Sequence, residues 1–145
     1  MSGFLLDTPA ISEGIKPRPD RGLAAWLNKV DENSTYISVL TIGELQEGIA
    51  RLDPRVSKRA ELERWLTYDL IARFGRRVLA FDTNVARRWG ALVAAALDRG
   101  LVLSVVDSQI AATASLYGLA IVTRNERHFS ATGVTIFNPW TQPPP

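Results

Sequence analysis

Short apolar runs alternate with segments of helical spacing along the 145 residues of this chain. The first run, residues 4–6, is continuously apolar, which is typical of a strand that a parallel sheet buries on both faces. The later runs are rich in β-branched, aromatic and other apolar residues, as strands are. The predicted strands are residues 4–6, 36–39, 77–81, 119–123 and 134–137.

Between these strands, apolar residues recur at the spacing of one helix face. After Asp7, Thr8 is predicted as the N-cap of a short helix and Pro9 as its first helical residue. Longer helices are predicted at residues 23–30, 41–52, 56–74, 83–99 and 108–117. The alternation predicts a three-layer α/β/α sandwich around a mainly parallel sheet. We expect this sandwich to be a single domain over residues 1–140, followed by a proline-rich tail at residues 141–145.

Composition excludes several classes of protein. An apolar fraction of 46% with 22% charged residues is ordinary for a soluble globular domain. The lack of cysteine rules out disulfides and thiolate metal sites. No apolar run reaches membrane-spanning length, and Asp7 interrupts the N-terminal run, so a cytoplasmic protein without signal peptide or membrane contact is expected. The net charge of +2 does not by itself indicate nucleic-acid binding.

Acidic residues gather where strands end and helices begin. Asp7, Glu44, Asp107 and the corner at residues 123–125 all lie just beyond predicted strands or in the first turn of a helix that follows. In a parallel sheet these places share one edge. Clustered carboxylates repel one another unless a cation lies among them, and Mg²⁺ or Mn²⁺ suits such oxygen ligands. A site of this kind suits phosphodiester hydrolysis.

Each acid also has a structural interpretation. Glu44 ends a Thr-x-x-Glu pattern that matches a capping box, and Asp107 is placed to be an N-cap. Asp82, after another strand, is predicted to cap the helix that follows it. Asp7 has no such role, because Thr8 is predicted to cap its helix. From the residues alone, a metal site and a set of helix caps both remain open.

Motifs over nearly the whole chain resemble a known family. The most specific are VDSQIAATA at residues 106–114 and VTRN at residues 122–125. The others lie at residues 5–13, 38–49, 89–90, 132–134 and 138–140, together with Phe129. In this order and spacing, they resemble a PIN-domain protein of the VapC toxin type, including its FitB-like branch.

The resemblance implies a Mg²⁺- or Mn²⁺-dependent endoribonuclease, the toxin of a toxin–antitoxin pair. The acids of the family carry over to Asp7, Glu44 and Asp107 as metal ligands, with Asn125 completing the catalytic site. Other expected site residues are Thr8, Ser108 and Thr123 as hydrogen bonders beside the ligands, and Arg124 and Arg127 as contacts to RNA phosphates. The implied partners are RNA and a cognate antitoxin lying beside the helices of residues 40–74, in a homodimer or a toxin–antitoxin hetero-oligomer.

Two positions depart from the family pattern. Pro9 stands where the family usually has asparagine, which removes a polar side chain and a backbone donor beside Asp7. His128 stands where an acid is common, and it is most simply a solvated loop residue; Glu126 is a candidate substitute acid that is expected to point away. These departures favour an alternative, a catalytically impaired PIN-fold protein that only binds antitoxin or RNA. A DNA-directed nuclease is a further alternative.

Overall fold

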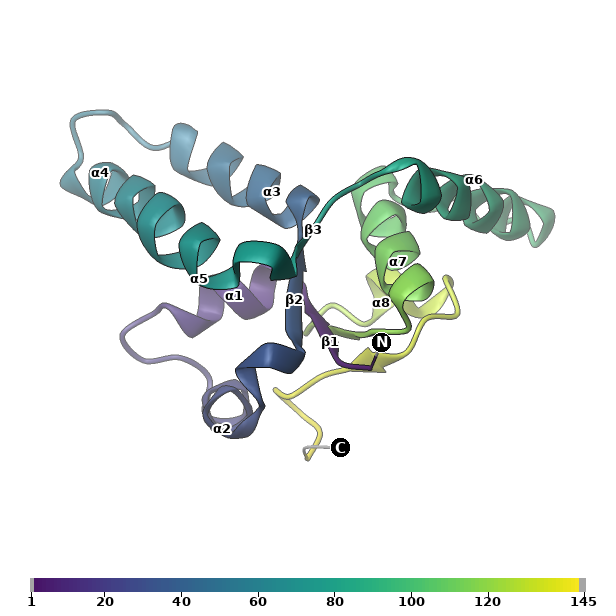
Figure 1. Ribbon diagram of the computed structural model, residues 1–145, viewed down its shortest axis with the longest axis horizontal. Coiled ribbons are helices and arrows are strands. Elements are labelled where there is room, and N and C mark those ends of the chain that lie inside the picture. Colours follow the sequence, from purple (N-terminus) through teal and green to yellow (C-terminus); the bar gives the residue numbers. More distant parts are fainter. Residues whose placement is uncertain (1, 144–145) are drawn as a thin grey trace.

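A single parallel sheet forms the centre of the computed structural model, which describes residues 2–143 (Figure 1). Within these residues the sheet has five strands in the order β3-β2-β1-β4-β5, and each neighbouring pair is parallel. The strands are β1 (Phe4–Leu6), β2 (Thr35–Ser38), β3 (Val78–Leu79), β4 (Ala120–Val122) and β5 (Ile136–Phe137). The parallel sheet is therefore confirmed. The first strand has the predicted bounds, β2 begins and ends one residue earlier than predicted, and β3, β4 and β5 are shorter than predicted.

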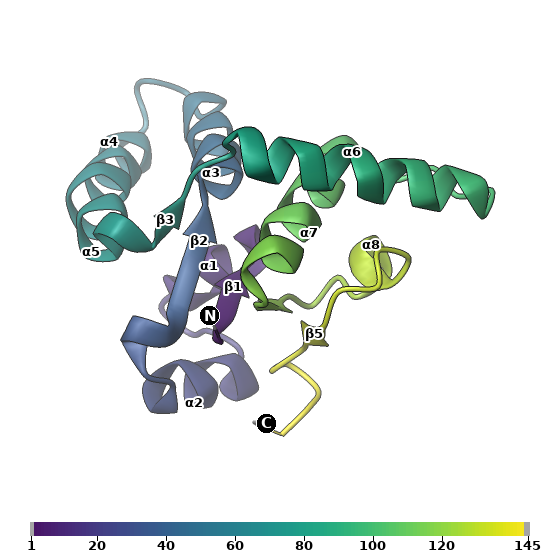
Figure 2. The ribbon, with the colours of Figure 1, turned by 45° about the vertical axis from the view of Figure 1, so that its right-hand side comes forward.

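Helices cover both faces of the sheet, which confirms the α/β/α sandwich (Figures 1 and 2). Leu6 packs with α1 to α4 on one face, whereas Leu5, the next side chain along β1, packs with α7 and α8 on the other. This is the alternation that a strand buried on both faces requires. The helices are α1 (Thr8–Gly14), α2 (Arg21–Lys29), α3 (Val39–Ala50), α4 (Ser57–Arg64), α5 (Ala72–Phe74), α6 (Thr83–Asp98), α7 (Val105–Tyr117) and α8 (Arg127–Ser130).

The helix predicted at residues 56–74 is continuous but not regular. It consists of α4, a π-helical segment η2 (Trp65–Ile71) and α5. Hydrophobic spacing alone does not distinguish a π turn from an α turn, because both leave one apolar face. Two 3₁₀ turns, η1 (Glu32–Ser34) and η3 (Gly75–Arg77), lead into β2 and β3.

Helix boundaries differ from the predictions where a cap was misassigned. The helix α3 begins at Val39 because the Ser38 hydroxyl accepts a hydrogen bond from the Leu40 amide at 3.0 Å. The predicted cap of α6 is confirmed, since the Asp82 carboxylate accepts from the Val85 amide at 3.0 Å. Gly100, with a φ of +75°, follows the end of α6 as predicted. The short helix α8 was not predicted.

Among the described residues, the helices are all too short or too polar to cross a bilayer. After β5 the chain continues to residue 143 without a further helix or strand. The predicted proline-rich tail, 141–145, extends beyond this point, and its residues 144–145 lie outside the described residues.

Candidate active site at the carboxyl edge of the sheet

Asp7 is a buried carboxylate held at the junction of β1 and β4. Its residue is 4% exposed, and its amide donates to the Val122 carbonyl at 3.0 Å, which continues the pairing of the two strands. The Thr123 hydroxyl, at the end of β4, donates to Asp7 Oδ2 at 2.9 Å. The Asn125 amide in turn donates to that hydroxyl at 3.0 Å. Residues 123–125 thus form the corner that the sequence predicted, and they orient Asp7.

Burial raises the pKa of Asp7 from its usual 3.8 to about 6. The negative charges of Asp107 and Glu44 raise the pKa further, whereas hydrogen bonds from the Thr123 hydroxyl and the Thr8 amide oppose the change. Asp7, which follows β1, therefore lies within electrostatic reach of Glu44 on α3 and of Asp107 on α7. The sheet brings together the carboxylates that the sequence placed at its edge.

Thr8 and Glu44 form a contact that the sequence did not reveal. The Thr8 hydroxyl donates to Glu44 Oε1 at 2.6 Å and thus joins α1 to α3. The prediction of Thr8 as N-cap is wrong, because Asp7 occupies that position without a capping side-chain bond, and Thr8 and Pro9 are the first helical residues. Because the Thr8 hydroxyl donates its hydrogen bond to Glu44, it does not cap α1.

The capping box predicted at Glu44 is also wrong. Ser38 caps α3, so Thr41 lies inside the helix. The Thr41 hydroxyl is fully buried and has no hydrogen-bond partner in the described part of the chain, residues 2–143. Thr41 lies three residues before Glu44 and hence on the same face of α3. The Thr41 hydroxyl and the Glu44 carboxylate on this face therefore do not cap the helix.

Asp107 lies in the first turn of α7, which begins at Val105 after Ser104 as its N-cap residue, so its interpretation as an N-cap is wrong. Its side chain is 21% exposed, and its Oδ2 atom lies 3.5 Å from His128 Nδ1. His128 belongs to α8 and its side chain is 55% exposed. The histidine is therefore solvated, as predicted, but it lies in a short helix and not in a loop, and its Nδ1 atom lies near one of the candidate ligands.

Several predicted site residues have other contacts. The Ser108 hydroxyl accepts from Trp89 Nε1 at 2.9 Å and donates to the Val105 carbonyl at 2.8 Å, so it joins α6 to α7. Glu126 accepts a hydrogen bond from the Asn138 side chain at 3.0 Å, which directs its carboxylate toward the C-terminal segment, consistent with the expectation that it points away.

The two predicted phosphate-binding arginines follow β4. The Arg124 guanidinium lies over the Trp140 ring, 5.8 Å from its centroid. Arg127 is exposed at the start of α8. Neither arginine belongs to an ion pair within residues 2–143. Both positive charges remain available to an anion.

The donor chemistry of the site fits a hard divalent cation. Burial and neighbouring acids make the charged form of Asp7 unfavourable, and a cation among the carboxylates would relieve this repulsion. The unpartnered Thr41 hydroxyl adds a further oxygen on the face of Glu44. In residues 2–143, however, no three or more His, Cys, Asp or Glu side chains are already close enough to hold an ion. The acids lie near one another, but they do not form a preformed set of metal ligands.

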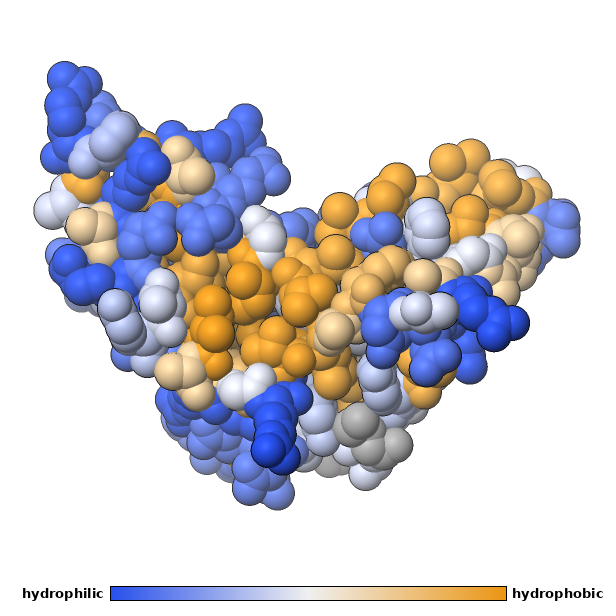
Figure 3. Space-filling model, turned by 45° about the horizontal axis from the view of Figure 1, so that its top comes forward, coloured by the Kyte–Doolittle hydropathy of each residue, from blue (hydrophilic) through white to orange (hydrophobic). Residues whose placement is uncertain are grey.

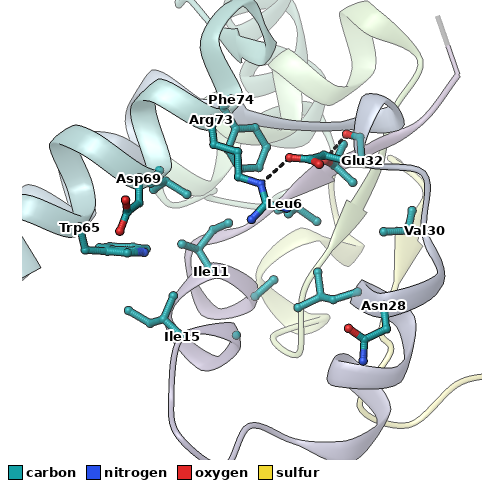
Figure 4. A pocket seen from close by; sticks show the side chains of 15 residues that line it. Leu6, Ile11, Ile15, Asn28, Val30, Glu32, Trp65, Asp69, Arg73 and Phe74 are labelled. Atoms are coloured by element: carbon teal, nitrogen blue, oxygen red, sulfur yellow. Dashed lines mark hydrogen bonds and ion pairs between the residues drawn. The ribbon is translucent and has the colours of Figure 1, made fainter.

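A groove lies on the face of the sheet that α1 and α2 cover, beside the helices of residues 40–74 along which the resemblance placed an antitoxin (Figure 4). It has a volume of about 340 Å³. Its apolar wall includes Ile11, Ile15 and Trp65, and an ion pair between Arg73 and Glu32 lies at one end. The π-helical segment contributes Trp65, Asp69 and Leu70 to this groove.

Comparisons with known proteins agree with this architecture. The model of the PIN domain family matches residues 4–134. VapC ribonuclease Y4jK of Sinorhizobium fredii is 36% identical over 137 residues, which cover 94% of this chain and 97% of that protein. Toxin FitB of Neisseria gonorrhoeae is also 36% identical over 137 residues, covering 94% and 98%.

Solved structures show the same fold. The crystal structure of FitAcB from Neisseria gonorrhoeae has a TM-score of 0.89 at 34% identity and covers 96% of this chain and 99% of that chain. The crystal structure of DNA-bound VapBC from Salmonella typhimurium has a TM-score of 0.77 at 26% identity, covering 97% and 99%. The chain therefore belongs to the PIN domain family, among its members of the VapC and FitB type.

Proposed function

We propose that this protein is a metal-dependent endoribonuclease and the toxin of a toxin–antitoxin pair. The observation that carries the proposal is the buried Asp7, whose pKa is raised by its burial and by Asp107 and Glu44 at the same sheet edge. Within residues 2–143, only the Thr123 hydroxyl and the Thr8 amide donate hydrogen bonds to this carboxylate, and no positive charge neutralises it. Perturbed acids of this kind concentrate at functional sites. The similarity to VapC ribonuclease Y4jK covers 94% of this chain and 97% of that protein.

Asp7 and Asp107 are the proposed direct ligands of Mg²⁺ or Mn²⁺, with Glu44 binding directly or through water. When bound, such an ion supplies a Lewis acid for the scissile phosphate and lowers the pKa of the attacking water. Thr123 holds Asp7 in orientation, and Thr8 does the same for Glu44. Asn125 completes the pocket beside them.

The arginines after β4 are proposed to hold RNA phosphates on either side of the cleaved bond. Stacking on Trp140 restricts the Arg124 guanidinium while its N–H groups stay available to a phosphate. Arg127, three residues later, is exposed and belongs to no ion pair among the residues that the structure describes. Such contacts position the nucleic acid without reading its sequence.

The direct test is cleavage of a panel of structured RNAs and matched DNAs by purified protein free of any antitoxin. We expect RNA to be cut with Mg²⁺ or Mn²⁺, to survive with a chelator, and DNA to stay intact. The rival interpretation, a protein that binds RNA without cutting it, is favoured by Pro9 and by the lack of a preformed set of metal ligands within residues 2–143. RNA that is bound but uncut with both metals would establish the rival, and cleavage of DNA alone would establish a DNA nuclease.

The proposed partner is an antitoxin whose apolar segment lies in the groove lined by Ile11, Ile15 and Trp65. The related structures include FitAB bound to a DNA fragment and DNA-bound VapBC from Salmonella typhimurium. Large exposed apolar surfaces mark interaction sites. One face of the molecule has a broad apolar middle bordered by hydrophilic side chains (Figure 3). In the groove itself, the apolar side chain of Ile15 is exposed. A homodimer or hetero-oligomer belongs to the same proposal.

Substitution of Ile15 by glutamate tests the groove. Ile15 is 43% exposed, so the change is expected to weaken antitoxin binding by about 10- to 100-fold without unfolding the protein or reducing RNA cleavage. Calorimetric titration with the antitoxin from the neighbouring reading frame measures the effect. The matched control is Ile71→Glu, since Ile71 is 39% exposed and does not line the groove. Equal weakening by both variants would place the antitoxin elsewhere.

A further inference from the structure

A shallow hollow on α6 and α7 contains two arginines that the site described above does not use. It has a volume of about 310 Å³ and is lined by Asn84, Arg87, Arg88, Ala91 and Leu116. Four of these residues belong to α6, between its second and ninth residues, and the fifth lies near the end of α7. These two helices lie side by side on the face of the sheet opposite the groove (Figures 1 and 2).

The charge of this hollow is not neutralised. Arg88 Nη1 donates to the Ser115 hydroxyl at 2.8 Å, so a neutral group fixes the direction of the guanidinium without cancelling its charge. No ion pair within residues 2–143 includes Arg87 or Arg88. By contrast, Arg51 and Arg55 are paired with Glu47 and Asp53.

The lining suits an anion that is attached to a less polar group. Two guanidinium groups offer N–H donors in the geometry that phosphate oxygens accept. Asn84 adds an amide, while Ala91 and Leu116 provide an apolar part of the wall. A phosphodiester with its sugar combines these two properties, whereas a free carboxylate or an acidic side chain leaves the apolar part unused.

The position of the hollow relates it to the candidate active site. Trp89, the residue after Arg88, donates to Ser108, which directly follows Asp107. Leu116 is nine residues beyond Asp107 on α7, which is about 14 Å along the helix axis. A nucleic-acid strand carries one charge per about 3.4 Å of rise, so one strand can reach both places within a few nucleotides.

We propose that this hollow binds backbone phosphates of single-stranded RNA a few nucleotides from the cleaved bond. The proposal rests on the proposed ribonuclease function for the identity of the nucleic acid. Arg87 and Arg88 set the path of the strand across α6, and they contribute affinity without base preference.

The test measures RNA binding separately from cleavage. In an Asp107→Asn background, a fluorescent RNA of about 20 nucleotides is titrated at several salt concentrations with and without Arg87→Ala and Arg88→Ala. Each single-strand phosphate contact contributes about 0.7 to the slope of log affinity against log salt. Loss of both arginines is expected to lower that slope by about 1.4 and to weaken binding about 10-fold at low salt. A trinucleotide, too short to reach the hollow, is expected to bind the two proteins equally.

The matched control is the pair Arg51→Ala and Arg55→Ala, which removes the same charge from arginines that are already paired. An unchanged slope, equal losses in the control pair, or a preference for duplex DNA over RNA would overturn the proposal. If the double variant unfolds at a lower temperature than wild type, the single variants Arg87→Gln and Arg88→Gln are used instead. Each is expected to lower the slope of log affinity against log salt by half as much as the double variant. Failure of wild type to cut any RNA would refute the nuclease function, while the salt slope would still report on the hollow.

Discussion

RNA cleavage by an Asp7→Asn variant is expected to be about 100- to 1,000-fold slower than cleavage by the wild type, or slower still. The substitution keeps the size of the side chain and an oxygen that accepts the Thr123 hydrogen bond, but it removes the negative charge from the centre of the acidic group. Loss of a charge that stabilises the reacting groups directly costs two to three orders of magnitude or more in rate. Initial rates at saturating Mn²⁺ measure the effect, and Asp107→Asn is expected to behave alike.

The chain contains a matched control for this experiment. The sequence Phe81-Asp82-Thr83 repeats the strand-acid-threonine arrangement of Leu6-Asp7-Thr8, but Asp82 is exposed and caps α6. Asparagine is as good a cap as aspartate, so Asp82→Asn is expected to retain the wild-type rate. Full activity in Asp7→Asn, or an equal loss in Asp82→Asn, would remove Asp7 from the mechanism.

The same substitution is expected to stabilise the protein when no metal is present. In the folded state the pKa of Asp7 is about 6, compared with 3.8 for the ordinary carboxyl. The folded state therefore binds the Asp7 proton more tightly than the unfolded state does. As the pH rises from about 4 to 6 this carboxyl loses its proton, and the free energy of unfolding falls; above pH 6 the loss is complete. The difference corresponds to about 3 kcal/mol in the free energy of unfolding at pH 7.

Urea unfolding of wild type and Asp7→Asn in a chelating buffer at pH 4, 5, 6 and 7 measures this difference. The two proteins are expected to be similar in stability near pH 4, and the advantage of the variant is expected to grow up to pH 7. Addition of Mn²⁺ is expected to stabilise the wild type more than the variant, because a ligand that binds only the folded state adds to its stability. A gap that is the same at every pH would show that Asp7 does not titrate as a buried acid.

These two expectations together separate a functional role from a structural one. A helix cap contributes to stability alone, so its removal lowers stability and leaves the cleavage rate of the folded protein unchanged. An acid that is buried among other acids for its chemistry destabilises the empty site, so its removal raises stability while activity is lost. Asp82 and Asp7 have similar sequence surroundings, but we expect Asp82 to act as a helix cap and Asp7 as an acid of the active site.

The sequence by itself determined the sheet and the edge on which the acids lie. Apolar runs such as residues 4–6 and 119–123 are local signals, because a strand buried on both faces must be apolar at every position. Parallel strands joined by helices then place Asp7 and Glu44 at one edge without further information. Local capping chemistry was also sufficient where no distant group competed, as at Asp82.

Only the tertiary structure decided which side chains meet at that edge. The Thr8 hydroxyl was predicted to cap its own helix, but Glu44, 36 residues later, takes its hydrogen bond. Asp7 is held by Thr123, 116 residues away, and Asp107 lies against His128. The groove beside the π-helical segment likewise depends on helices that are distant in sequence. Such polar groups have several possible partners of similar strength, and packing selects the partner by bringing it within 3 Å.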